Sequence, residues 1–112
     1  MIARHWTGWT RKDDADAYEQ LLRDTVLPGL RRIEGYRGGY VLRREESGEV
    51  RFVVVNLFDS LEAVKAFAGP DYDTPVFEPE AQRLLSHYEP KALHYDVSVA
   101  SVRCTYNLPV GD

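Results

Sequence analysis

The hydrophobic pattern is most informative between Phe52 and Phe58, where six of the seven residues are apolar and Asn56 is the exception. A strand with one solvated face alternates between apolar and polar positions, whereas a strand that is apolar on both faces must be covered on both. The rest of the sequence offers enough helix for a single layer only. We therefore expect a second copy of the chain to cover the other face.

Strand patterns also occur over residues 2–10, 36–44 and 91–99. The last of these segments alternates, with one apolar and one polar face. Residues 45–49 form a short polar connection whose glycine, Gly48, can adopt a positive φ. This connection predicts a β-hairpin made of residues 36–44 and 50–58.

A first helix is predicted after residues 12–14, which supply an N-cap, and its apolar positions recur at helical spacing to about Val26. Pro28 cannot donate a backbone hydrogen bond and crowds the preceding turn. Residues 27–33 are therefore expected to be either a kinked extension of the helix or a separate turn. Gly35 ends this region.

Two further helices are predicted in the second half of the chain. Asp59 and Glu62 have the spacing of a capping box for a helix over residues 60–68, which Gly69 and Pro70 end. An apolar stripe predicts a third helix over residues 79–88. The intervening loop, residues 71–78, carries Pro and Asp but also apolar residues, so we expect it to fold back as a lid.

The element order β, α, β, β, α, β is that of an α+β, ferredoxin-like fold with a four-stranded antiparallel sheet. In that fold the first and third strands are central and the helices cover one face. Two-fold pairing through the other face would then give a dimeric α/β barrel. Residues 1–99 are expected to form the one domain, and residues 100–112 a tail that either frays or lies along a neighbouring subunit.

Composition limits the classes of function. The 112 residues include 44% hydrophobic and 29% charged residues, as in ordinary globular domains, and the net charge is -4. Scattered charges of both signs argue against nucleic acid as a partner, and no apolar run is long enough to suggest a membrane partner. The absence of a signal-like N-terminal segment leads us to expect a cytoplasmic protein. The single cysteine, Cys104, excludes an intrachain disulfide and a cysteine-cluster metal site.

Several motifs carry a resemblance to a known family. They are Val-Asn-Leu-Phe-Asp-Ser at 55–60, Leu-Glu-Ala-Val-Lys-Ala-Phe-Ala-Gly at 61–69, Pro-Glu-Ala at 79–81 with Leu84 and Leu85, and His-Tyr-Asp-Val at 94–97. With these motifs, the chain from Ile2 to Val99 resembles the antibiotic biosynthesis monooxygenase superfamily. That superfamily is a shared scaffold for quinone-forming oxygenases, haem-degrading enzymes, autoinducer-processing proteins and members without an assigned activity, so the resemblance implies a fold more firmly than a reaction.

The haem-degrading branch fits this chain poorly at the matching positions. Phe67 stands where the resemblance implies a Trp that distorts haem, and Phe77 stands where it implies the histidine that binds iron. Phenylalanine cannot ligate iron, so a ligand would have to come from His5 or His87. His5 itself stands where that branch has an Asn near bound oxygen.

The quinone-forming branch implies an oxygenase that uses no metal or other cofactor. Its substrate, an electron-rich polycyclic phenol, is deprotonated and reacts directly with oxygen. We expect His5 to lie on the strand face toward the helices and to act as base or oxyanion partner, with Asn56 as an orienting donor. The alternatives are purely structural: His5 is a half-buried, hydrogen-bonded histidine, and Asn56 satisfies a local backbone group.

The remaining candidates are expected to bind a small, largely aromatic ligand between the sheet and the helices. They are Trp9, Phe58, Phe67, Tyr72, Phe77 and His87. Aromatic residues at strand and helix spacing are more often ordinary core, and a histidine on the third helix is more often a surface residue. His94 and Asp96 share a strand face and could form a hydrogen-bonded pair with a structural or dimer-interface role.

Two other classes of function remain open. One is a non-catalytic ligand-binding or stress-associated homodimer on the same scaffold, which a cavity lacking His5 and Asn56 would favour. The other is an isomerase or lyase that moves a proton on a small keto or enol compound. Oxygen dependence would distinguish the oxygenase from the isomerase.

Overall fold

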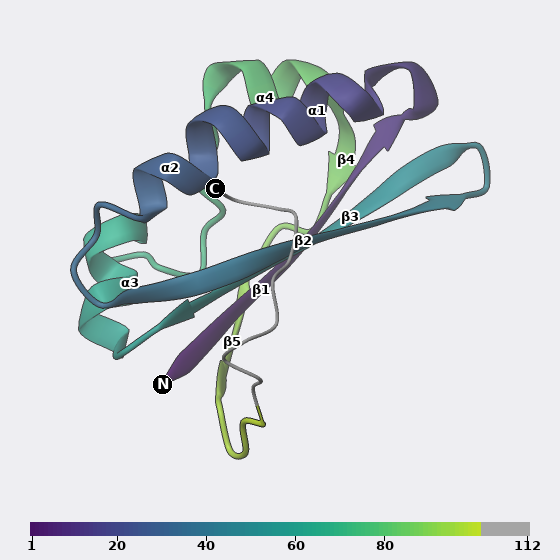
Figure 1. Ribbon diagram of the computed structural model, residues 1–112. Helices are drawn as coiled ribbons and strands as arrows, with labels where there is room; N and C mark the ends of the chain where they lie inside the picture. The colour runs from purple at the N-terminus through teal and green to yellow at the C-terminus, as the bar shows by residue number, and fades with distance from the viewer. Residues whose placement is uncertain (102–112) are drawn as a thin grey trace.

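The computed structural model describes residues 1–101 and contains one twisted antiparallel sheet (Figure 1). Its strands are β1 (Ile2–Arg11), β2 (Tyr36–Glu46), β3 (Glu49–Phe58), β4 (Leu85–Tyr88) and β5 (Leu93–Asp96). The order is β2-β3-β1-β4, and β5 pairs with the first residues of β1 while β4 pairs with its later residues. The ferredoxin-like fold with β1 and β3 at the centre is therefore confirmed, but the sheet has five strands instead of the predicted four, because β4 and β5 share one edge of β1.

The helices lie together on one face of this sheet (Figure 1). They are the 3₁₀ turn η1 (Lys12–Asp14), α1 (Ala15–Leu21), the π-helical turn η2 (Leu22–Val26), α2 (Leu27–Leu30), α3 (Leu61–Ala68) and α4 (Pro79–Leu84). Among the described residues, none of these helices has the length and apolar content needed to cross a bilayer.

The first helix continues through Pro28, as the kinked-extension alternative expected. Pro28 has no N–H to donate to the carbonyl four residues earlier, and the helix widens just before it. The N–H of Leu27 accordingly bonds to the carbonyl of Leu22, five residues back. Such π turns recur at functional sites, and this one carries two residues of the cavity described below.

Strand β3 is apolar on both faces, and the two faces have different surroundings. Val50, Phe52, Val54 and Phe58 are buried beneath the helices, whereas the alternate residues of β3 are only partly buried. On that second face, Tyr40 and Leu42 from β2 are 44% and 54% exposed, and Leu93 and Tyr95 from β5 are 52% and 53% exposed. No described helix covers this face, which we call the open face of the sheet.

The third predicted helix is too long, because α4 ends at Leu84 and residues 85–88 form β4 instead. Leu85 has extended backbone angles and pairs with Thr10 of β1. This edge of β1 needs backbone partners that the shorter β5 does not reach, since an unpaired buried N–H or C=O is costly. The final strand is likewise shorter than the predicted residues 91–99.

Two turns differ in detail from the predictions. Ser60, not Asp59, caps α3 by accepting a hydrogen bond from the N–H of Ala63, while Asp59 pairs with Arg37. The hairpin turn is confined to Ser47 and Gly48, whose φ angles of 52° and 84° are typical of a type I′ turn.

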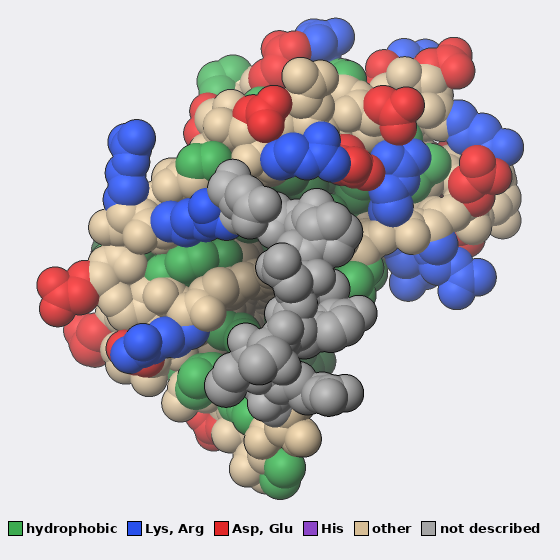
Figure 2. All heavy atoms as spheres, viewed as in Figure 1, with side chains coloured by type: hydrophobic (Ala, Val, Ile, Leu, Met, Phe, Trp, Pro, Cys, Tyr) green, Lys and Arg blue, Asp and Glu red, His purple; other side chains and the backbone are tan. Residues whose placement is uncertain are grey.

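Acidic and basic side chains are interspersed on the side of the molecule drawn in Figure 2. The predicted role of the tail, and Cys104 within it, lie outside the described residues, apart from Ala100 and Ser101.

Candidate functional site

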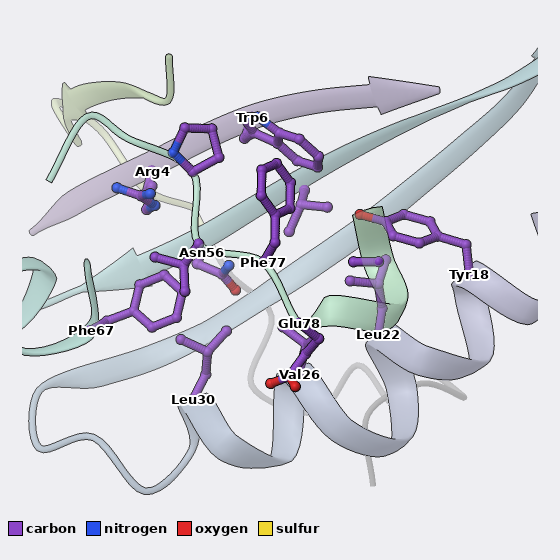
Figure 3. A pocket seen from close by; sticks show the side chains of 14 residues that line it. Arg4, Trp6, Tyr18, Leu22, Val26, Leu30, Asn56, Phe67, Phe77 and Glu78 are labelled. Atoms are coloured by element: carbon purple, nitrogen blue, oxygen red, sulfur yellow. The ribbon is translucent and has the colours of Figure 1, made fainter. Parts of the chain in front are cut away.

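A cavity lies between the helix-facing side of the sheet and the helices (Figure 3). Its volume is about 60 Å³. Its walls come from β1, β3, the first helix, α3, α4 and the loop before α4. The lining residues are Arg4, Trp6, Tyr18, Leu22, Val26, Leu30, Val54, Asn56, Phe67, Pro75, Val76, Phe77, Glu78 and Ala81.

Strand and helix periods explain which residues reach the cavity. Side chains two apart on a strand share a face, which places Arg4 and Trp6 together. Leu22, Val26 and Leu30 recur every four residues and form the facing helical wall. Arg4 and Asn56 are direct cross-strand partners in the antiparallel pair β1 and β3, so the two polar residues of this apolar wall are neighbours.

Arg4 is only 5% exposed. Its Nη1 donates to the carbonyl of Tyr72 and contacts Nε2 of His94 at 3.0 Å, and its Nη2 donates to the carbonyl of Thr74 at 3.1 Å. The guanidinium also lies over the Phe67 ring, 5.5 Å from its centre. Burial lowers the pKa of Arg4, and the charge of Asp73 partly opposes that shift. Arg4 therefore brings a buried positive charge to the cavity wall and ties the loop of residues 71–78 to β1.

Asn56 is held in one orientation by Tyr36. The Tyr36 hydroxyl donates to Oδ1 of Asn56 at 2.9 Å, which leaves the Asn56 amide N–H groups for the cavity. Burial raises the pKa of Tyr36 to about 12, so the hydroxyl stays protonated and remains a donor. A Cβ on Gly39 would lie 2.2 Å from Oδ1 of Asn56 and 2.8 Å from the Tyr36 hydroxyl. Only glycine leaves room for this pair.

His94 forms a second layer behind Arg4. Because arginine can only donate, Nε2 of His94 must accept and Nδ1 carries the proton, 3.4 Å from Oδ1 of Asp73. Burial, reinforced by the charge of Arg4, lowers the pKa of His94, although Asp73 acts in the opposite direction. The pairing with Asp96 that the sequence suggested is wrong, because Asp73 from the loop takes that place.

The loop of residues 71–78 folds back over the cavity, as the sequence predicted. Pro75, Val76 and Phe77 line the cavity, and the carbonyl of Asp73 accepts from the N–H of Ala92 at 2.7 Å. With the two contacts from Arg4, this ties residues 72–74 to β1 and to the residue before β5.

The expected orientation of His5 is wrong. His5 lies on the open face, where it meets the edge of the Tyr95 ring and lines a shallow hollow with Leu93. Residues at even positions of β1 face the helices and residues at odd positions face away. Both faces of β1 carry an aromatic residue and a basic one, so the sequence pattern alone does not show which face lies toward the helices.

Trp9 and His87 also lie away from the cavity. Their rings stack with centres 4.3 Å apart, and Arg51 lies over Trp9 on the open face. The Trp9 indole donates to Glu46 at 3.3 Å, and His87 lies 3.0 Å from Glu49. These residues form a surface cluster whose polar groups satisfy one another.

The other predicted residues lie in or near the cavity. Asn56, Phe67 and Phe77 line it. Phe58 is fully buried behind Phe67, with ring centres 6.2 Å apart, and Tyr72 packs against the same cluster and offers its carbonyl to Arg4. Sequence reasoning missed Arg4 and Tyr36; the available signal for Arg4 was that it shares a strand face with Trp6.

Comparison with known proteins identifies the family. The sequence model of the family described as antibiotic biosynthesis monooxygenase matches residues 1–72, well over half of the chain. The chain belongs to the antibiotic biosynthesis monooxygenase family. No curated protein sequence matches it.

Solved structures share the fold of this family member at low sequence identity. A candidate antibiotic biosynthesis monooxygenase from Deinococcus radiodurans has a TM-score of 0.65 and 17% identity, over 92% of this chain and 98% of that one. A similar candidate from Bacillus cereus has a TM-score of 0.63 and 15% identity, over 92% and 96%. The haem degrader MhuD from Mycobacterium tuberculosis, whose structure holds two haems in its active site, has a TM-score of 0.58 and 17% identity, over 91% and 100%.

The cavity residues of this family member do not fit haem. The lining contains no imidazole, thiolate or thioether among the described residues, and Phe77 offers no ligand atom. Tyr18 does line the cavity, but burial raises its pKa and so disfavours the phenolate that would bind iron. His5 and His87 face away from the cavity, and Nε2 of His94 is already bonded to Arg4.

Proposed function

We propose that the chain binds a small hydroxylated aromatic molecule in this cavity and oxygenates it without a metal or other cofactor. The observation that carries the proposal is the position of Asn56. Its amide is oriented by Tyr36 and presented from an apolar strand beside Trp6, Phe67 and Phe77. A fixed donor in a water-poor site stabilises an oxyanion more effectively than the same donor in water.

The reaction consistent with this site begins with loss of a proton from a phenol or enol. Asn56 donates to the resulting oxyanion, whose charge is shared with a conjugated ring carbon. That carbon transfers electrons to O₂ and forms a C–O bond, and the peroxide anion takes a proton from solvent to become a hydroperoxide. Loss of water from the hydroperoxide removes the remaining hydrogen of that carbon and leaves a carbonyl. One CH₂ group and one O₂ thus become one C=O and one H₂O, and the substrate supplies all the electrons.

Glu78 is our candidate proton acceptor. It is the one carboxylate among the described cavity-lining residues, and it lies at the start of α4 on the helix side of the cavity (Figure 3). Because Glu78 is also exposed, its carboxylate can pass the proton to solvent without crossing the apolar interior.

Ligand entry requires the later part of the loop, residues 75–78, to move, while residues 72–74 stay tied to Arg4 and Ala92. A volume of 60 Å³ is far below the ~300–1,000 Å³ of typical ligand pockets. Pro75, Val76, Phe77 and Glu78 are the lining residues contributed by this loop, and Val76 is 49% exposed. Their displacement would open the cavity without disturbing β1 or β3.

The test measures oxygen consumption with hydroxylated anthrones and quinols. Asn56→Leu, which keeps the size but removes the donor, should lower the rate by about 10²–10³-fold. His5→Ala is the matched control and should leave the rate unchanged, because His5 faces away. Equal rates for wild type and Asn56→Leu would overturn the assignment.

Two other results would redirect the function. Tight binding of these aromatics without oxygen consumption would instead indicate a ligand-binding protein. Turnover in the absence of oxygen would indicate an isomerase or lyase.

We also propose that the open face pairs with a second copy of the chain to form a homodimer. Support comes from the half-exposed Tyr40, Leu42, Leu93 and Tyr95, beside the partly buried Val55 of β3. Leu42→Asp should halve the mass measured by sedimentation at micromolar concentration, because an aspartate would be desolvated in the contact. Glu45→Gln, at an exposed position near the hairpin turn, is the control. A monomeric wild type would contradict the pairing.

A further inference from the structure

We propose that Arg4 is a carboxylate receptor, so that the ligand of this cavity is an aromatic acid whose carboxylate lies beside a hydroxyl or carbonyl oxygen. This inference rests on the proposed function only for the location of the ligand. It does not depend on the reaction.

The first argument is that the charge of Arg4 is not paired directly with a carboxylate of residues 1–101. Arg4 is 5% exposed, yet no carboxylate of the described residues lies within ion-pair distance of it. Asp73 is the nearest acidic influence, and His94 stands between the two side chains. A buried arginine held by neutral carbonyls is costly unless an anion compensates it.

The second argument is the number of donors left on Arg4. Both N–H groups of Nη1 and one of Nη2 are engaged by Tyr72, His94 and Thr74. The N–H of Nε and the second N–H of Nη2 have no partner among the described residues. These two nitrogens share one edge of the planar guanidinium, and a carboxylate can accept from both at once.

Other arginines of the same chain bind carboxylates through the Nε and Nη2 edge. Arg11 donates from Nε and Nη2 to Asp14, and Arg37 donates from the same two atoms to Asp59. Arg51 and Glu46 repeat the arrangement. Arg4 differs from these arginines in that no carboxylate of the described residues lies at its edge and its side chain lines a cavity.

The neighbours of Arg4 define the rest of the ligand. Asn56 is its cross-strand partner, so a second oxygen of the ligand would lie close to the carboxylate. Phe67 already packs against the guanidinium and Phe58, so Trp6 and Phe77, which also line the cavity, are the aromatic residues left to contact the ligand ring. Glu78 would repel an anion, but it belongs to the helix side of the cavity, whereas Arg4 belongs to the sheet side (Figure 3).

The test compares two ligands that differ in charge but hardly in shape, 1-hydroxy-2-naphthoate and 1-hydroxy-2-naphthamide, by isothermal titration calorimetry at pH 7. We expect wild type to bind the acid at least ~10-fold more tightly, as suits a two-point charged contact. Arg4→Gln should remove this preference. Arg51→Gln is the matched control, because Arg51 also lies over an aromatic ring, on the open face, and it should keep the preference.

Circular dichroism shows whether each variant is folded. If Arg4→Gln does not fold, Arg4→Lys replaces it, since lysine keeps the charge but loses the paired donors, and the preference should shrink. Equal affinity of wild type for acid and amide, failure to bind the acid, or an unchanged preference in the Arg4 variant overturns the proposal.

The outcomes also separate this inference from the proposed function. Selective binding of the acid without oxygen consumption by any anthrone or quinol would leave the receptor in place and refute the oxygenase. Oxygenation with the same kcat/KM for acidic and neutral substrates would support the oxygenase and refute the carboxylate receptor.

Discussion

The polar residues on the two faces of strands β1 and β3 have different surroundings. On the open face, Trp9, Arg51 and Glu46 bond to one another near solvent, and their charges are balanced within the group. On the helix side, Arg4 and Asn56 are buried in an apolar wall and retain donors that no residue of 1–101 engages. Polar residues that satisfy one another need no ligand, whereas buried donors with spare capacity in a cavity wall indicate one.

The largest expected difference between the faces is in stability. Phe52→Ala removes a fully buried ring on the helix side and should lower the free energy of unfolding by about 3–5 kcal/mol in urea denaturation. Leu42→Ala, on the open face, should cost less than ~1 kcal/mol at low protein concentration, because Leu42 is 54% exposed. Similar losses in both variants at low concentration would contradict the contrast between the faces.

Gly39→Ala should have the next largest effect, because a Cβ there collides with Asn56 and with the carbonyl of Val55. Such overpacking should cost about 1–3 kcal/mol of unfolding free energy and displace the Asn56 amide, so oxygen consumption should fall as well. Gly29→Ala is the matched control. Its Cβ meets nothing within 4 Å, and its helical position should make the change neutral or stabilising by ~1 kcal/mol at most. Unaltered activity in Gly39→Ala would argue against the role of Asn56.

Part of the fold could be predicted from the sequence, and part depended on contacts between distant residues. The central strands, the hairpin and the lid loop followed from local patterns, because each depends on residues close together in the chain. The orientation of β1 did not, because Arg4 on the buried side is tolerated only through the carbonyls of Tyr72 and Thr74, about seventy residues away. Strand β4 was missed for the same reason: its helical spacing is overridden by pairing with β1.

Tyr36→Phe should have a smaller effect, since it removes one hydroxyl and keeps the ring. Loss of the bond to Asn56 should lower the free energy of unfolding by about 1 kcal/mol and reduce kcat for any oxygenation that depends on the amide. Tyr40→Phe, on the open face with Tyr40 44% exposed, should change stability by no more than ~0.5 kcal/mol. Equal behaviour of the two variants in both measurements would show that the Tyr36 hydroxyl does not position Asn56.

The smallest expected effect is the pH dependence of stability that His94 contributes on the helix side. Folding lowers the pKa of His94, chiefly through burial and then through the charge of Arg4, so the unfolded chain binds the proton more tightly than the folded one. Stability should therefore rise as pH increases toward and through the unfolded pKa of about 6.5, and fall below it until the folded pKa is passed. His94→Gln, which keeps an acceptor for Arg4, should flatten the unfolding free energy between about pH 5 and 7. His87→Gln, on the surface beside Glu49, is the control. If the unfolding free energy of His94→Gln changed with pH as steeply as that of wild type, His94 would not have the role behind Arg4 that is assigned to it.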